Sequence, residues 1–235
     1  MNGQTDQAPG ILDVTEAWTN AYPGAHAGVL VMRAVTNPPH NEALQSRKDE
    51  LERSLRSRFG GMDRAGLRAD PTLRIYEEYY KRFDKTYHVA LQLESIVLKG
   101  KPIPKGAALV EAMFMAEVDS MLLTAGHALE AVRPPLRLDA ATGTETYVLL
   151  RGTTQATKAG DMMISDREGI LSSIVYGPDQ RTQIRPSTTS AIFTVYAPAG
   201  IQVTAIEEHL QLIASYVRTF ALAAVVEALA VFPES

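Results

Sequence analysis

The first residue with clear catalytic potential is His127, near the middle of the chain. Gly126-His127 follows residues 107–123, which are apolar on nearly every side and are predicted to form a buried helix. Gly126 is expected to end this helix in a left-handed cap, which leaves His127 beside the helix C-terminus. The helix dipole would favour the charged imidazole there. From these residues alone, a catalytic histidine and a structural capping histidine both remain open.

A polar loop between two strand-like runs is the second candidate. Its sequence is Gly177-Pro178-Asp179-Gln180-Arg181-Thr182. Polar groups on a loop held by rigid strands are a common geometry for binding sites. A solvated hairpin turn is the alternative, which Gly-Pro-Asp suits equally well.

The third candidate is the carboxylate of Glu111, within the apolar helix of residues 107–123. Asp119 lies eight residues further on, about 80° around the helix, so both are expected to lean to one side. A buried carboxylate needs a partner or a raised pKa. Glu111 is therefore either a functional group or a hydrogen-bonded structural acid.

A basic stretch with interleaved aromatic residues is a weaker signal. Residues 51–83 carry eight basic and five acidic side chains, with Tyr76, Tyr79 and Tyr80 among them. Basic charge with aromatic rings can bind nucleic acid. A solvated helix face is the plainer interpretation.

Composition and missing motifs exclude several classes of protein. Hydrophobic residues make up 46% and the net charge is −4, which suits a globular protein and excludes one that is basic throughout. The sequence contains no cysteine, which excludes thiolate nucleophiles, zinc ribbons and iron–sulfur clusters. It has no P-loop, no dinucleotide-binding glycine motif and no serine-hydrolase elbow, and its five histidines lack metal-ligand spacing. We expect no metal and no cofactor.

The positioning elements follow the order helices, then strands, then a helix. Helical signals cover residues 41–59, 71–83, 87–98, 107–123 and the segment from 203 to 224. Short strand-like runs cover 28–35, 136–138, 146–150, 162–164, 171–175 and 191–196. This order predicts an α+β fold, with a mixed, sheet-rich core flanked by helices. Residues 1–10 are expected to form a flexible tail, and residues 11–235 a single domain.

The longest apolar run, residues 220–232, is interrupted only by Glu227. It is about half as long as a membrane-spanning helix, and we interpret it as a buried C-terminal helix. The first ten residues lack the basic and apolar regions of an export signal. A cytoplasmic protein without membrane contact is therefore expected.

Six motifs in order between Tyr76 and Pro198 carry a family resemblance. They are Tyr80-Lys81-Arg82-Phe83, Leu98 to Pro104, Leu109-Val110-Glu111, Gly126 to Glu130, Gly160 to Asp166 with Gly169, and Arg181-Thr182 with Thr188. Together they resemble the editing domain of the bacterial phenylalanyl-tRNA synthetase beta subunit, the B-three/four tRNA-binding domain, which also occurs as freestanding proteins.

The resemblance implies an α+β domain with a pocket for the aminoacyl end of tRNA. It implies a protein that binds an aminoacyl-tRNA or a tRNA 3′ end and acts as a deacylase in trans. His127, Asp179 and Glu111 are then the expected catalytic residues. The expected substrate-binding residues are Gly126, Gly177, Arg181, Thr182 and Thr194.

Three positions depart from the family pattern. Met113 and Phe114 stand where the synthetases have a Thr-Asn pair, and Thr194 stands near the family's pocket glutamate. These apolar and uncharged replacements motivate an alternative, a non-catalytic binder of a free amino acid or related small metabolite. A scaffold protein that forms a homodimer through its C-terminal helix is the third possibility.

Overall fold

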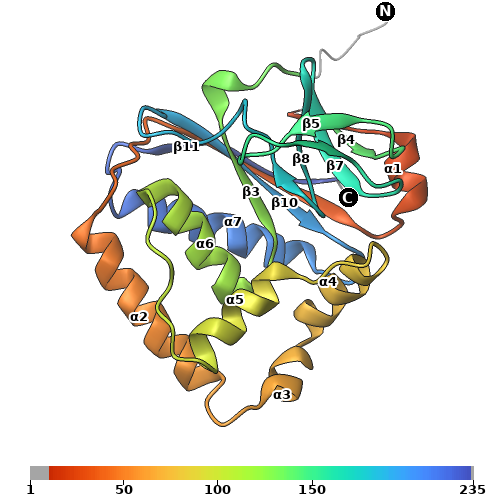
Figure 1. Cartoon of the computed structure of the whole chain (residues 1–235). Helices are drawn as coiled ribbons and strands as arrows, with labels where there is room; N and C mark the ends of the chain where they lie inside the picture. Colours follow the sequence, from red (N-terminus) through yellow and green to blue (C-terminus); the bar gives the residue numbers. More distant parts are fainter. Residues whose placement is uncertain (1–10, 234–235) are drawn as a thin grey trace, which may run out of the picture.

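A four-stranded antiparallel sheet organises the molecule (Figure 1). The computed structural model describes residues 11–233, and the flexible tail predicted for residues 1–10 lies outside them. The strand order is β11-β2-β10-β3. The four strands are β2 (His26–Arg33), β3 (Thr124–Ala128), β10 (Ser190–Ala197) and β11 (Val225–Phe232).

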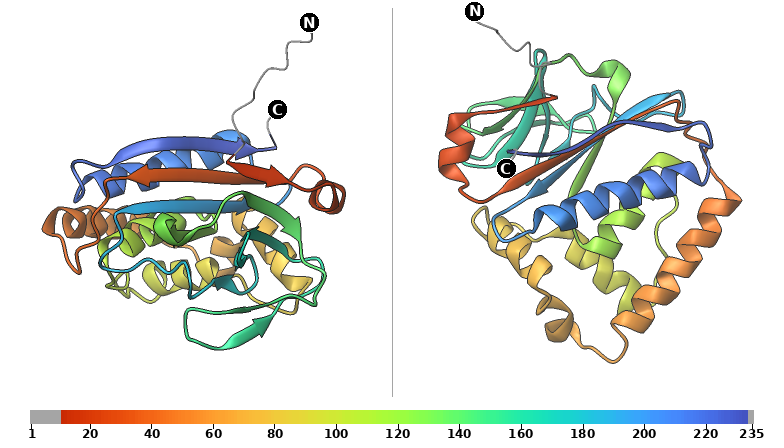
Figure 2. Two further views of the ribbon diagram at one scale, coloured as in Figure 1. Left: turned by 90° about the horizontal axis from the view of Figure 1, so that it is seen from above. Right: turned by 180° about the vertical axis from the view of Figure 1, so that it is seen from behind.

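Helices gather on one side of this sheet, with α7 lying along it (Figures 1 and 2). They are α2 (Glu42–Arg58), α3 (Arg64–Arg68), α4 (Pro71–Lys81), α5 (His88–Val97), α6 (Ala108–Ser120) and α7 (Val203–Arg218). Asn41, Asp63 and Asp70 cap α2, α3 and α4, because each side chain accepts a hydrogen bond from a first-turn backbone N–H. The five helices predicted from the sequence are present within these bounds.

Smaller sheets lie on the other side. A five-stranded sheet has the order β1-β4-β7-β8-β9, in which β1 is parallel to β4 and the remaining pairs are antiparallel. Its strands and the hairpin β5-β6 are β1 (Leu12–Val14), β4 (Leu136–Ala140), β5 (Thr146–Val148), β6 (Thr154–Ala156), β7 (Met162–Asp166), β8 (Gly169–Ser173) and β9 (Gly177–Pro178). Two short helical turns, α1 (Glu16–Ala21) and η1 (Leu129–Ala131), complete the chain. The predicted α+β class, with a mixed sheet-rich core, is confirmed.

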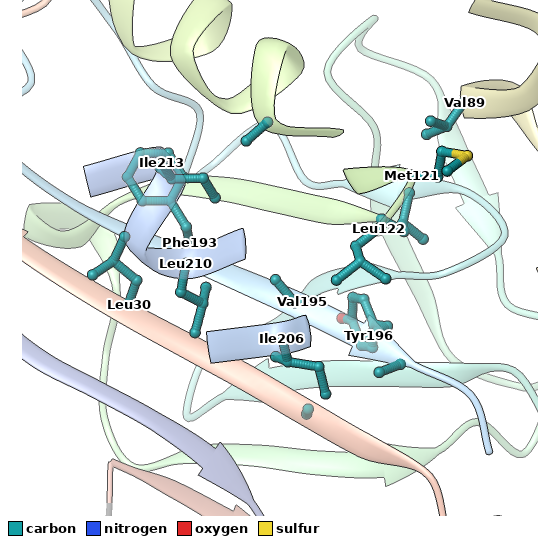
Figure 3. Close-up of a cluster of buried hydrophobic side chains, with 14 of the residues drawn as sticks. Leu30, Val89, Met121, Leu122, Phe193, Val195, Tyr196, Ile206, Leu210 and Ile213 are labelled. Carbon is teal, nitrogen blue, oxygen red and sulfur yellow. The ribbon is translucent and has the colours of Figure 1, made fainter. Parts of the chain in front are cut away.

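The main core lies between the four-stranded sheet and α7 (Figure 3). Leu30 and Phe193 of the sheet contribute to one buried cluster with Leu210 and Ile213 of the helix. Gly28 lets the helix approach closely, because a Cβ there would lie 2.5 Å from Ile206 Cγ2. The side of the sheet on which Phe193 lies is therefore closed by helix packing.

The predicted C-terminal helix is wrong. Helix α7 ends at Arg218, and Val225–Phe232 form β11, which pairs antiparallel with β2. A continuous apolar run of this length suits a buried helix and a strand alike, so periodicity does not separate them. The pairing partner β2 decides the outcome, and the predicted dimer-forming C-terminal helix is absent from the described residues.

The predicted end of the apolar helix is also wrong. Helix α6 ends at Ser120, and Met121 adopts the left-handed conformation with φ of 63°. Gly126 and His127 lie in β3 instead. His127 is thus held by strand pairing and not by a helix C-terminus.

The interleaved tyrosines belong to the core. The hydroxyl of Tyr76 donates to the Tyr196 carbonyl at 2.5 Å, and that of Tyr80 donates to the Ile174 carbonyl at 2.7 Å. Tyr79 donates to Asp161 at 2.8 Å. All three rings are buried, so they join α4 to both sheets and are not available to stack on nucleic-acid bases.

Candidate functional site

Three buried polar side chains form a hydrogen-bonded chain at the end of β3. His127 Nδ1 lies 2.7 Å from Thr182 Oγ1, and the Thr182 hydroxyl donates to Asp179 Oδ1. The Thr182 backbone N–H also donates to Asp179 Oδ1, at 3.1 Å. His127 and Thr182 are completely buried and Asp179 is almost so. We call these three residues the buried network.

The direction of these bonds defines the form of the imidazole. Thr182 has a single hydroxyl proton, and Asp179 receives it. Thr182 Oγ1 must therefore accept the proton of His127 Nδ1–H, which leaves Nε2 with a free lone pair. Nε2 is buried and has no hydrogen-bond partner among the described residues. The arrangement is that of an oriented acceptor, with Asp179 fixing the tautomer through Thr182.

Burial dominates the electrostatics of the network. Burial, assisted by the nearby charge of Arg181, lowers the pKa of His127 to about 3. The imidazole is therefore neutral at physiological pH, which contradicts the charged form predicted beside a helix end. Burial also raises the pKa of Asp179, although hydrogen bonds from Thr182 oppose this effect.

Arg181 connects the network to the surface. Its guanidinium donates to Asp166 at 2.9 Å and to the Ala131 carbonyl at 2.7 Å. It also lies 3.6 Å from Asp179 and 3.4 Å from Glu168. With three carboxylates within 4 Å, Arg181 is largely neutralised and held in one position.

A hollow of about 380 Å³ lies directly beside Arg181. Arg133, Arg181 and Arg185 line it, together with Glu130 and hydroxyl-bearing side chains of residues 187–189. Arg185 has no carboxylate partner among the described residues, so its guanidinium is the one best able to bind an anion. We call this feature the arginine hollow.

The two glycines and Thr194 have different surroundings. Gly177 adopts a φ of 80° and its carbonyl accepts from the Tyr147 hydroxyl at 2.8 Å, so a glycine suits the turn that leads to Asp179. Gly126 faces the helices, because a Cβ there would meet Met113 and Phe193. Thr194 is buried in β10, opposite Ala125. Gly126 has no side chain that could join the buried network. The side chain of Thr194 makes no hydrogen bond to the network among the described residues.

Glu111 lies apart from the network. Its carboxylate accepts from Lys48 Nζ at 2.9 Å and from the Gly106 backbone N–H at 2.8 Å. Both charged side chains are buried between α2 and α6. Asp119 does not join them, and lies 3.9 Å from Arg58 instead. Glu111 is therefore ion-paired, and it has no hydrogen bond to the buried network among the described residues.

The positions where the sequence departs from the family pattern fall on two faces of the sheet. Met113 packs at Gly126 on the helix side, whereas Thr194 is directly opposite Ala125 and so shares its face, along with His127. Neighbouring residues of a strand point to opposite faces. Met113 and Thr194 therefore do not line one common pocket.

Several residues at the site were not predicted from the sequence. Asp166 anchors Arg181 and was visible only as the end of the motif Gly160 to Asp166. Arg133 and Arg185 reach the arginine hollow from separate loops and carry no local signal. Within residues 11–233, no group of three or more His, Asp or Glu side chains could hold a metal ion. In the same range, no helix combines the length and apolar composition needed to cross a membrane.

Comparison with known proteins gives a weak similarity. The sequence matches no protein-family model and no curated protein. A solved N-terminal fragment of the phenylalanyl-tRNA synthetase beta-subunit from Pyrococcus horikoshii is similar, with a TM-score of 0.49 and 10% identity. The match covers 95% of this chain and 54% of that fragment, so the chain spans about half its length. A similarity this low shows neither a shared family nor a shared activity.

Proposed function

We propose that this protein binds the 3′ end of an aminoacyl-tRNA in the arginine hollow and hydrolyses its ester bond at His127. One observation carries the proposal. His127 and Thr182, 55 positions apart in the sequence, are hydrogen-bonded to each other beside a hollow lined by arginines. Both residues belong to motifs that resemble the editing domain of phenylalanyl-tRNA synthetase.

The hollow suits the sugar–phosphate end of an RNA. A guanidinium such as that of Arg185 can bind a phosphate through two parallel hydrogen bonds. The hydroxyls of residues 187–189 can bind ribose. Arg181 positions the site, because its own charge is already compensated by carboxylates. The net charge of −4 permits this mode, since one RNA end presents few phosphates.

The proposed reaction uses water as the nucleophile. His127 Nε2 accepts a proton from a water molecule as the water oxygen attacks the ester carbonyl. The bond from the carbonyl carbon to the ribose oxygen then breaks, and the ribose oxygen takes the proton from the imidazole. Because burial lowers the pKa of His127, the imidazole is a weak base. We therefore expect its rate enhancement to lie at the low end of the ~10²- to 10⁴-fold that is usual for general-base catalysis. Nε2 is buried, so the structure must also open before a substrate can reach it.

Release of amino acid from charged tRNAs tests the hydrolytic part. A panel of correctly and wrongly charged tRNAs is incubated with the protein and with His127→Gln, which keeps a polar side chain of similar length. We expect release from one or a few tRNAs, lowered at least tenfold in His127→Gln. Equal release by the variant would remove His127 from the mechanism. No release from any tRNA would leave a binding protein without hydrolytic activity.

A further inference from the structure

A second cavity, separate from the arginine hollow, lies between the two sheets. It has a volume of about 560 Å³, within the range of small-molecule sites. Its lining includes Val31, Ile192 and Ala228 from the four-stranded sheet and Leu136 from β4. Val31, Ile192 and Leu136 are otherwise buried, so an apolar interior reaches solvent here.

Charged side chains of both signs line the same cavity. Arg33 and Glu227 are hydrogen-bonded to each other through two contacts, one of them 3.1 Å long. Asp13 and Arg167 also line the cavity, and neither side chain has a hydrogen-bond or ion-pair partner among residues 11–233. Within residues 11–233, one carboxylate and one guanidinium are therefore left unpaired at this cavity.

A polar hollow adjoins the apolar cavity. Its volume is about 510 Å³, and it shares Asp13, Pro135 and Arg167 with its neighbour. The two free charges thus stand where an apolar space meets a polar one. A matching ligand has an apolar body, one positive group and one negative group.

We propose that this cavity binds a free apolar α-amino acid. Its side chain enters the space between Val31, Ile192 and Leu136, its ammonium contacts Asp13, and its carboxylate contacts Arg167. A guanidinium and a carboxylate bind these two groups through charge-assisted hydrogen bonds. The apolar part supplies affinity in proportion to the area removed from water. The inference does not rest on RNA binding, because the cavity shares no lining residue with the arginine hollow.

Calorimetry with matched ligands tests the assignment. The probes are L-phenylalanine, 3-phenylpropanoate, which lacks the ammonium, and 2-phenylethylamine, which lacks the carboxylate. We expect saturable binding of L-phenylalanine, at least threefold weaker binding of the other two, and weaker binding of L-phenylalanine to Asp13→Asn and Arg167→Met. Asp13→Asn should bind L-phenylalanine and 3-phenylpropanoate with similar affinity, because the group that distinguishes them is gone.

The variants Asp13→Asn and Arg167→Met change exposed side chains, so folding is expected to be unaffected. Asp49→Asn, an exposed position on α2, is the matched control and should bind as the unchanged protein does. Absence of saturable binding, or binding equally strong in both cavity variants, would overturn the proposal. The assay contains no RNA, so its result is independent of tRNA binding and of ester hydrolysis.

Discussion

At the scale of single residues, Thr182 determines the geometry of the candidate site. Its one hydroxyl donates to Asp179 and accepts from His127, so both neighbours depend on it. Thr182→Val keeps the shape of the side chain but removes these hydrogen bonds. An unsatisfied buried polar group costs about 1–3 kcal/mol. We expect Thr182→Val to lower the free energy of unfolding by that amount, measured by urea denaturation.

Thr182→Ser is the matched control, because serine keeps the hydroxyl and loses one methyl group. Thr182→Ser should lower the free energy of unfolding clearly less than Thr182→Val does. If serine destabilised the protein as much as valine, the methyl packing of Thr182 would matter more than its hydrogen bonds, and Thr182 would not be the residue that orients His127.

Glu117 makes stability depend on pH. It is buried without a cationic partner among residues 11–233, accepts from the Thr124 N–H at 2.8 Å, and burial raises its pKa from 4.5 to about 8. Between these pH values the folded state holds a proton that the unfolded state has lost, so stability falls as pH rises. Glu117→Gln removes this titration and should flatten the decline between pH 6.5 and 8.

The difference between the two proteins isolates Glu117 from other buried groups. Burial lowers the pKa of His127 and of His209 to about 3, so their contribution changes up to about one pH unit above the usual histidine value of 6.5, and it does so equally in both proteins. Asp161, with its pKa raised by burial to about 6, loses its proton mostly below the window. Stability is measured by urea unfolding at each pH. If it declined in parallel in the unchanged protein and in Glu117→Gln, burial would not have raised the pKa of Glu117.

At the scale of elements, Gly28 sets the approach of α7 to β2. A Cβ there would come within 2.5 Å of Ile206 Cγ2 and 3.1 Å of Leu210 Cδ1. Overpacking of this kind costs about 1–3 kcal/mol, so Gly28→Ala should lower thermal stability. The double variant Gly28→Ala/Ile206→Ala lacks the clashing group, so its loss of stability should be smaller than the sum of the losses in the two single variants. Simple additivity would mean that the helix moves freely away from the sheet.

The buried ion pair of Lys48 and Glu111 joins α2 to α6. Removing one partner leaves a buried charge without compensation, which costs about 3–5 kcal/mol. Lys48→Met should therefore be strongly destabilising in urea denaturation. Lys48→Met with Glu111→Gln should recover much of the loss, because no charge stays buried. A double variant as unstable as the single one would show that the lysine stem, and not its charge, holds the helices together.

Elements with a strong local pattern were predictable. Asn41 caps α2 as its sequence indicates, and the runs at 136–138, 162–164 and 191–196 are strands. The two wrong elements depend on distant partners. Residues 225–232 form a strand because they pair with β2. Gly126 has an extended backbone because its strand, β3, pairs with β10. No local pattern encodes either partner.

The site follows the same division. The loop 177–182 and His127 stand out by residue type, yet only the fold brings Thr182 to the imidazole. The sequence alone makes Glu111 a candidate of the same kind. It does not reveal the ion pair, because the partner Lys48 lies 63 positions earlier. Arg185 reaches the arginine hollow from a loop whose position depends on β10.

At the scale of the whole molecule, the proposed function requires recognition of an RNA end. The chain is acidic overall, so general attraction to RNA is weak. Binding must therefore depend on the arginine hollow and on few phosphates, with a correspondingly shallow decrease in affinity as salt is raised.

The most direct measurement compares the affinity for a tRNA with an intact 3′ end and for the same tRNA trimmed at that end, at two salt concentrations. We expect at least tenfold tighter binding of the intact tRNA, a preference that Arg185→Ser abolishes and that Arg53→Ser, an exposed position on α2, leaves unchanged. Equal affinity for intact and trimmed tRNA would contradict binding of the acceptor end.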